Sequence, residues 1–585
     1  MILKYLGKKG WALTALMTVL VVCQVYLDIS IPGYMNDMTD AIQEQVVAGD
    51  GSTDAVVENG TKMIAAAFLS LVMAVGTAVV SARIASDLTT SIRRMEFSKV
   101  LSFSSQDISE FSAASLVTRS TNDPYQLMSF ITRGLVFTLK APITAILAIW
   151  MIWGMDLGWT AATGVAVAAL IAITSAGMVY SMPRFKRIQW LTDRVNRAAR
   201  EDLEGQRTVR AYNAEKRQTE KLDRASDDLL DNNLSIVHAL APMHPAVSSI
   251  NNFLTLAIYW MGAGLIASAG DAAFRMQEFS DMVVFTSYAS QVISAFMMMT
   301  GVVRMLPRAL VASRRVEEVI DHAPSIEDGP REKGEEGEEG TVEFRHVTFT
   351  YPGTSEKVLD DVSFSIGKGE TLAIIGPTGG GKSSIVRLIP RLYDPDSGQV
   401  LIDGVDAKEY RQSALHSKIG FVPQDAVIFT GTVAENVAYG DTAEKVTEED
   451  VWKALEVAQA RDFVERSPDK LNTVISQYGR NISGGQKQRI CIARAVCRQP
   501  EIYVFDDSFS ALDFKTDLAL REALKREAAG STRIIVAQRV GTVMDADRIA
   551  VVDKGKIVGL GTHDELLKSC PVYREIAESQ MGGGA

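Results

Sequence analysis

The chain has 585 residues, a formal net charge of −11 and four cysteines. That length allows more than one domain. The negative balance, with no basic stripe or tail, argues against nucleic acid as a main partner because nothing would neutralise the phosphates. The cysteines show no paired spacing, so the sequence predicts a reducing compartment and no zinc or redox motif.

Hydropathy divides the chain into two unlike parts, which average to a mean hydropathy of +0.07. We expect an α-helical transmembrane domain over residues 1–310, a linker over 311–340 and a soluble α/β domain over 341–585. Six apolar runs are long enough to span a bilayer: about 11–34, 62–84, 134–155, 157–180, 246–268 and 279–303. The helical period persists in the polar stretches after the second and fourth runs, so these helices should continue into water.

Charge predicts the orientation of the spans. The loop Tyr34–Thr61 contains Asp37, Asp40, Glu44, Asp50, Asp54 and Glu58, and no Lys or Arg. The long polar stretches contain Arg93, Arg94, Lys99, Arg119, Arg184, Lys186, Arg187, Arg194, Arg197 and Arg200. Positive residues favour the cytoplasmic side, so we expect the acidic loop outside and both termini inside. The charged, Gly-rich segment Glu327–Gly340 should lie solvated between the two halves.

A glycine-rich loop joins a predicted strand to a predicted helix. The strand Thr371–Ile375 runs into the expected ATP-binding residues Gly376, Pro377, Thr378, Gly379, Gly380, Gly381, Lys382, Ser383 and Ser384. Glycines let backbone N–H groups turn inward around phosphates, and Lys382 is placed to reach the β- and γ-phosphates. The Ser383 hydroxyl is a candidate Mg²⁺ ligand. The spacing therefore predicts a site for ATP and Mg²⁺.

Asp506 ends the apolar run Ile502–Phe505. A carboxylate at the end of such a strand in a P-loop protein holds Mg²⁺ through water. Alone it would often be only a helix cap, but the upstream P-loop favours the metal role.

The remaining motifs resemble those of ABC exporters, in the order typical of that family. The whole chain is similar to one half-transporter of the type IV, multidrug-resistance-like group. The matching residues are Tyr351 for the aromatic that stacks on adenine, Gln424 for the Q-loop, Ser483, Gly484, Gly485 and Gln486 for the signature, and Asp513 for the D-loop. The resemblance implies that Gln424 contacts Mg²⁺. It also implies that the signature acts in trans on ATP bound by a second subunit.

The polar stretches between the spans also resemble exporter sequences. Residues Phe103–Asp123 and Glu204–Asn213 are similar to the intracellular loops that carry coupling helices. The resemblance places contacts with nucleotide-binding domains near Ser104–Phe111 and Tyr212–Lys216. Taken alone, both stretches would be read as solvated amphipathic helices.

Two catalytic positions depart from the exporter pattern. Asp507 stands where exporters usually have Glu, and Gln538 where they usually have His. Asp is one methylene shorter, and losing a positioned general base typically costs ~10²–10⁴-fold in rate. Gln can hydrogen-bond but cannot carry a proton or a positive charge. Asp can sometimes serve as a base and Gln can preserve a hydrogen bond, but two replacements in one half-site favour a weakened site.

The signature is intact apart from Ile482 for the usual Leu. We therefore hypothesise a heterodimer in which this chain's Ser483–Gln486 completes a hydrolytic site whose Glu and His come from the partner. The alternatives are a slow homodimeric pump and an ATP-gated channel or regulator.

The sequence indicates less about the transported substrate than about ATP binding. The resemblance implies export of an amphipathic compound, such as a drug, lipid or peptide, across the inner (plasma) membrane. Asp28 is embedded in the first span and is a candidate for a substrate, proton or helix-packing role. Met297–Met299 could line an apolar substrate surface, pack against neighbouring helices or face lipid.

Overall fold

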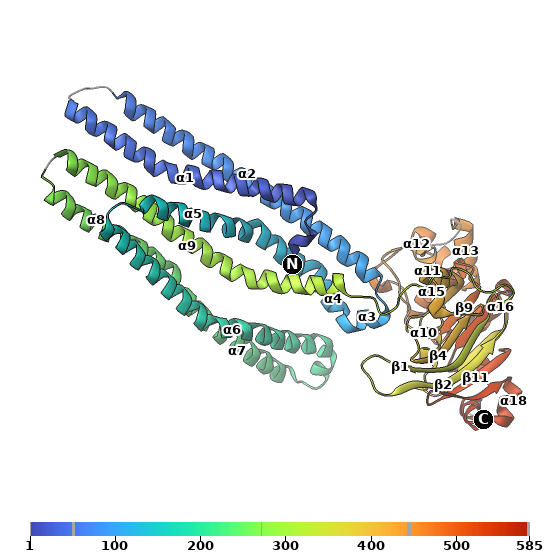
Figure 1. Cartoon of the computed structure of the whole chain (residues 1–585). Helices are drawn as coiled ribbons and strands as arrows, with labels where there is room; N and C mark the ends of the chain where they lie inside the picture. Colours follow the sequence, from blue (N-terminus) through green and yellow to red (C-terminus); the bar gives the residue numbers. More distant parts are fainter. Residues whose placement is uncertain (1, 49–52, 271, 441–445, 582–585) are drawn as a thin grey trace. The chain divides into compact units, whose positions relative to one another are not determined.

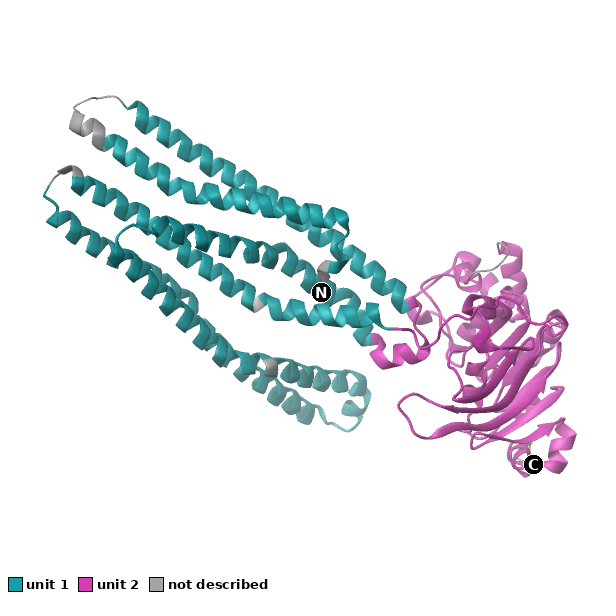
Figure 2. Cartoon of the chain, in the orientation of Figure 1, with its two compact units in different colours: residues 1–100, 114–322 teal, residues 101–113, 323–585 magenta. Residues whose placement is uncertain are grey.

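The computed structural model describes residues 2–48, 53–270, 272–440 and 446–581. Asp50 of the acidic loop lies outside these ranges. The chain forms two compact units (Figure 2): residues 1–100 with 114–322, and residues 101–113 with 323–585.

The first unit is entirely helical in its described part, and its long helices run alongside one another (Figure 1). Its elements are η1 (Ile2–Tyr5), α1 (Lys8–Ala48), α2 (Asp54–Leu101), α4 (Ala113–Ser129), the π-helical η2 (Phe130–Leu135), α5 (Val136–Ile152), α6 (Leu157–Ala211), α7 (Glu215–Leu240), α8 (Met243–Ser268) and α9 (Ala272–Asp321).

Six helices in the described part of the chain are long and apolar enough to cross a membrane, which confirms the six predicted spans. As predicted, α2 and α6 continue well past the apolar runs, to Leu101 and Ala211. The turn before α6 is set by Asp156, which caps the helix by accepting a hydrogen bond from the Trp159 N–H at 3.0 Å. The apolar core of this unit includes the fully buried Phe285 and Ile258.

The second unit contains three sheets. Their strands are β1 (Val342–Thr350), β2 (Lys357–Ile366), β3 (Thr371–Ile375), β4 (Ser397–Ile402), β5 (Val405–Asp406), β6 (Ile419–Val422), β7 (Gly431–Thr432), β8 (Val474–Ile475), β9 (Ile502–Asp506), β10 (Thr532–Val536), β11 (Arg548–Asp553) and β12 (Lys556–Gly561). The central sheet has the order β12-β11-β3-β10-β9-β6 and is parallel except for β12. The second sheet, β2-β1-β4-β5, is antiparallel, as is the short pair β7-β8.

The described part of the second unit also contains short helices. They are α3 (Ser105–Phe111), α10 (Lys382–Leu388), η3 (Ala407–Glu409), α11 (Gln412–Lys418), α12 (Val433–Val437), α13 (Glu448–Val457), α14 (Arg461–Glu465), η4 (Lys470–Asn472), η5 (Gln477–Gly479), α15 (Gly484–Cys497), α16 (Phe514–Glu527), α17 (Val540–Val543), α18 (His563–Ser569) and α19 (Pro571–Met581). Two apolar cores lie on the faces of the central sheet, and its strands β3, β9 and β10 are almost fully buried, as expected in an α/β domain.

Helix α3 belongs by its contacts to the second unit. Ser104 and Asp107 form a capping box at its start. The Asp107 carboxylate also accepts a hydrogen bond from the Ser325 N–H at 3.2 Å, and the Ser104 and Ser325 hydroxyls lie 2.7 Å apart. Helix α3 is thus bonded to Ser325, in the segment before the nucleotide-binding domain. The contacts with nucleotide-binding domains expected near Ser104–Phe111 and Tyr212–Lys216 stay predictions.

The segment Glu327–Gly340, which the sequence predicts to lie solvated, is also bound to the second unit through its backbone. Its charged side chains are mostly exposed, but its backbone is bound: the Gly329 N–H donates to the Tyr410 carbonyl at 3.0 Å, and the Arg331 N–H donates to the Glu409 carbonyl at 2.9 Å. A Cβ on Gly329 would lie 2.1 Å from the Glu409 carbonyl oxygen. Glycine here permits close backbone approach rather than flexibility. The predicted domain boundaries at residues 310 and 341 stay predictions. Helix α9 continues past the first of them, to Asp321.

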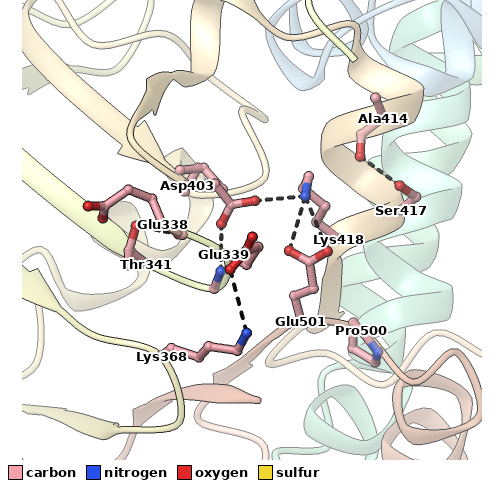
Figure 3. Close-up of polar contacts among 12 residues, drawn as sticks. Glu338, Glu339, Thr341, Lys368, Asp403, Ala414, Ser417, Lys418, Pro500 and Glu501 are labelled. Atoms are coloured by element: carbon pink, nitrogen blue, oxygen red, sulfur yellow. Dashed lines mark hydrogen bonds and ion pairs between the residues drawn. The ribbon is translucent and has the colours of Figure 1, made fainter. Parts of the chain in front are cut away.

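A buried charge cluster anchors the end of this segment (Figure 3). Asp403, in the turn between β4 and β5, has a fully buried side chain and accepts a hydrogen bond from the Gly340 N–H at 2.7 Å. The Lys418 ammonium lies 2.7 Å from the Asp403 carboxylate and 3.0 Å from that of Glu501, which precedes β9. The cluster therefore joins the segment before β1 to α11 and to the start of β9.

Candidate functional site

The predicted nucleotide residues gather at one edge of the central sheet. Strands β3, β9 and β10 are parallel neighbours, so their carboxyl ends share that edge. The P-loop follows β3, Asp506 ends β9 with Asp507 directly after it, and Gln538 comes two residues after β10. Gln424 follows β6, the next strand beyond β9. Residues separated by more than 160 positions are thus brought to one place by strand order.

Positive φ angles at two glycines and hydrogen bonds from its own lysine fix the conformation of the P-loop. Gly379 and Gly381 have φ of +81° and +101°, which favour glycine. The Lys382 ammonium donates to the carbonyls of Gly376 and Pro377, both at 2.8 Å. Burial lowers the pKa of Lys382, against the opposing effect of Asp507 and Asp506. Pro377, Thr378 and Gly379 are exposed, so the loop offers its backbone and a nearly buried cation to an anionic ligand.

Asp506 and Ser383 meet as predicted for a metal-binding pair. The Ser383 hydroxyl donates to Asp506 Oδ1 at 2.7 Å, and Asp506 is only 1% exposed. Asp506 Oδ2 is buried without a hydrogen-bond donor among the described residues, and Arg387 lies 4.0 Å from it. Burial raises the pKa of Asp506. A carboxylate with an unused oxygen beside a hydroxyl is a hard oxygen donor set that suits Mg²⁺.

Asp507 is held by two amide groups. Gln538 Nε2 donates to Asp507 Oδ2 at 2.8 Å, and Gln424 Nε2 lies 3.4 Å from the same oxygen. Asp507 is 7% exposed and adopts a left-handed backbone with φ of +51°. Burial and then Asp506 raise its pKa, while the hydrogen bond from Gln538 acts the other way. The two unusual residues are therefore direct partners.

Tyr351 lies beside the P-loop helix. Its hydroxyl is 3.1 Å from the Ser384 hydroxyl, and Arg387 Nη1 donates to it at 3.4 Å. Its ring makes edge contacts with Phe349 and Tyr393, at 4.9 and 5.3 Å between centroids. The half-buried ring is thus fixed next to Ser384, and adenine stacking on it stays a prediction.

The signature residues lie apart from this cluster. Ser483 caps α15, and its backbone N–H donates to Gln486 Oε1 at 2.9 Å in a capping box. Ser483 and Gly484 are exposed, and a Cβ on Gly484 would meet nothing within 4 Å. Asp513 caps α16 by accepting from the Thr516 N–H at 3.0 Å. None of the hydrogen bonds of Ser483–Gln486 in the described part of the chain reaches the P-loop.

Two contributors were not predicted from the sequence. Arg387 lies four residues after Ser383 on α10, so helical spacing could have indicated that it shares the face near Asp506. Gln580, on the C-terminal helix α19, clamps the loop after β10: its amide donates to the Gln538 carbonyl at 2.8 Å and accepts from the Val540 N–H at 2.7 Å. No local sequence pattern indicates these contacts of Gln580.

Gly376 offers a direct test of the loop geometry. A Cβ there would lie 1.9 Å from the Val552 carbonyl oxygen, which belongs to the backbone of β11. Because a buried strand cannot move aside, Gly376→Ala is expected to displace the loop and weaken ATP binding at least about tenfold. Equilibrium binding of a fluorescent ATP analogue measures this. Gly530→Ala, where a Cβ meets nothing within 4 Å, is the matched control, and equal affinities for the two variants would contradict the prediction.

Comparison with known proteins places both units in one family. Residues 14–296 match the family described as ABC transporter transmembrane region, and residues 359–510 match the family described as ABC transporter. An uncharacterized ABC transporter ATP-binding protein of Mycobacterium tuberculosis is 38% identical over 94% of this chain and 93% of its own length. An ATP-dependent lipid A-core flippase of Pseudomonas putida is 31% identical over 85% of this chain and 80% of the flippase.

A solved structure is similar along almost the whole chain. It is that of a bacterial Atm1-family ABC exporter with ATP bound, with a TM-score of 0.80 at 26% identity, and the match covers 98% of this chain and 100% of that one. The chain therefore belongs to the ABC transporter family, as an exporter half-transporter whose helical membrane domain is fused to a nucleotide-binding domain.

Proposed function

We propose that this ATP-driven exporter subunit works in a heterodimer, and that its own P-loop site binds ATP but hydrolyses it weakly. The observation that carries the proposal is the pairing of Asp507 with Gln538. The Gln538 amide donates to the carboxylate that would have to accept a proton from the attacking water. An amide cannot become a cation as charge moves to the γ-phosphate. Binding and occlusion of ATP are therefore the expected work of this site.

The exposed signature supports the other half of the proposal. Ser483 and Gly484 begin α15, so free N–H groups and the positive end of the helix dipole face outward. Such a surface suits the γ-phosphate of ATP bound by a partner. We expect that partner to supply a Glu and a His at the positions of Asp507 and Gln538. Hydrolysis then takes place in the partner's site, completed by Ser483–Gln486 of this chain.

ATP bound to this chain would be held by the P-loop. Ser383, Asp506 and Gln424 would hold Mg²⁺, which when bound neutralises phosphate charge, with Asp506 acting through water. Lys382 binds the β- and γ-phosphates, and Tyr351 stacks on the adenine. Positive-inside charge supports an inner (plasma) membrane protein with its ATP domain and termini in the cytoplasm.

The expected substrate is amphipathic: a drug, a lipid or a peptide. A cavity of about 480 Å³ in the membrane unit supports this class. Methionines 178, 243, 297 and 299 line it together with His244 and Thr300. Flexible thioether side chains suit apolar groups of varied shape, and the few polar groups can orient a head group. Met297 and Met299 thus line this cavity, while Met298 does not.

The test compares two variants in the assembled transporter. Asp507→Asn is expected to change its ATPase rate less than about threefold, because the site contributes little, whereas Ser483→Arg should lower it about 10²-fold by blocking the partner's γ-phosphate site. Thr447→Arg removes the same kind of capping box at α13, away from the signature, and serves as the control. A purified chain that forms active homodimers, and loses its activity through Asp507→Asn, would support the slow homodimeric pump instead. Ion conductance gated by ATP binding would indicate a channel.

A further inference from the structure

Two opposite charges meet inside the membrane unit. Asp28 on α1 and Lys140 on α5 form an ion pair with 3.3 Å between Oδ2 and Nζ. The Ser70 hydroxyl on α2 donates to the other carboxylate oxygen of Asp28. Gln291 on α9 donates from Nε2 to the backbone carbonyl of Asp28 at 3.3 Å. Four of the six helices long and apolar enough to cross a membrane thus contribute to one polar cluster.

The cluster lies within the predicted apolar layer. Gln291 is at the midpoint of its predicted span, about 18 Å from either end at 1.5 Å per residue. Asp28, Ser70 and Lys140 also fall within their predicted spans. A charged side chain at the centre of a bilayer costs about 2.5–3.5 kcal/mol on insertion scales, and such residues typically line substrate pathways.

The chain does not cover the pair completely. The side chain of Asp28 is 35% exposed and that of Lys140 is 20% exposed. Contact of these charges with hydrocarbon would be unfavourable, so their open side is expected to face a polar space, as translocation pathways are.

The groups have unused hydrogen-bonding capacity. Lys140 has three N–H donors, and Asp28 is its only ion-pair or hydrogen-bond partner in the described part of the chain. Gln291 Oε1 is buried and accepts no hydrogen bond from any described residue. An incoming anion could therefore bind Lys140, and an incoming ammonium could bind Asp28 with help from Gln291 Oε1.

Charge balance selects the kind of head group. The empty pair is neutral, so a singly charged head group would leave one charge uncompensated in a low-dielectric site. A head group with one anionic and one cationic part can pair with both residues, so the occupied site is neutral as well. We propose that Asp28 and Lys140 form a recognition site on the transport pathway for the head group of a zwitterionic amphiphile. This inference rests on the proposed export of amphipathic compounds.

The experiment measures binding of four probes to the full-length transporter in dodecyl maltoside. Dioctanoyl phosphatidylethanolamine is zwitterionic, dioctanoyl phosphatidylglycerol is anionic, dioctanoylglycerol is uncharged, and a dioctanoyl trimethylammonium propane is cationic. Quenching of intrinsic tryptophan fluorescence gives the affinities. The zwitterionic probe is expected to bind at least about tenfold more tightly than the other three.

The double variant D28N/K140Q removes both charges while keeping polar side chains of similar size, so it leaves no uncompensated charge. It should reduce the zwitterionic probe's affinity to that of dioctanoylglycerol. Thr163→Val is the matched control, because the buried Thr163 bonds only within its own helix among described residues. Equal preference for the zwitterion in wild type and double variant overturns the head-group site alone. Failure of all four probes to bind overturns it together with the proposed amphipathic substrate class.

Discussion

Replacing Asp507 with glutamate and Gln538 with histidine together is expected to raise ATP hydrolysis at this chain's own site by about 10²-fold. Low basicity would not limit Asp507 as a general base, because burial and Asp506 already raise its pKa. In the proposed weak site it would lack reach, because its side chain is one methylene shorter than glutamate and Gln538 occupies its Oδ2 at 2.8 Å. Glutamate restores the reach, and histidine restores a group that can carry charge.

The two positions are in direct contact, so their effects should not add. Each single variant is expected to raise the logarithm of the ATPase rate by much less than half as much as the double variant does. A double-mutant cycle measures this coupling between the two positions. The assay uses the transporter assembled with the proposed partner, whose hydrolytic site is inactivated so that only this chain's site contributes. Asp507→Asn combined with Gln538→His is the control without a base. A double variant no faster than this control would mean that the site is limited by something other than these two residues.

Replacing Lys418 with methionine is expected to lower the free energy of unfolding of the nucleotide-binding unit by about 3 kcal/mol. The substitution leaves the carboxylate of Asp403, which is fully buried, without its counter-charge (Figure 3). Burial alone would lower the pKa of Lys418, but its bonds to Asp403 and Glu501 outweigh this and raise it. The ion pair is therefore complete at neutral pH and would be lost only as the pH rises above the ordinary lysine value of 10.5.

Hydrogen–deuterium exchange of β1 and β4 peptides in a urea series on the full chain measures this loss. Lys368→Met is the matched control: Lys368 also forms an ion pair with Glu339 in this region, at 3.7 Å, but both side chains are more than half exposed. Its removal should cost at most about 1 kcal/mol. If both variants unfold at the same urea concentration, the buried pair does not anchor this region.

Much of the candidate site was predictable because its motifs are local. The P-loop is a continuous run in which glycine spacing, a lysine and a serine follow a buried strand, and the structure places β3 at the predicted Thr371–Ile375. The same holds for β9 before Asp506 and for Ser483 at the start of α15. The six spans were predictable for a related reason, since a bilayer demands about 20 apolar residues in each.

The segment Glu327–Gly340 shows where local reasoning was misleading. Its composition is typical of a flexible linker, but its glycines allow close approach to the carbonyl of Glu409 and to the Asp403 turn. Composition alone does not distinguish a glycine needed for freedom from one needed for contact.

The sequence by itself determined the family, the two-part architecture and the presence of Asp507 and Gln538 after two apolar strands, because these depend on residue type and spacing along the chain. Only the tertiary structure decided that Gln538 bonds to Asp507, that Gln580 clamps the loop behind them, and that Lys140 neutralises Asp28 across 112 positions. Each of these contacts depends on how separate helices and strands pack together. Packing brings together side chains that no spacing rule connects, because it is set by the whole fold.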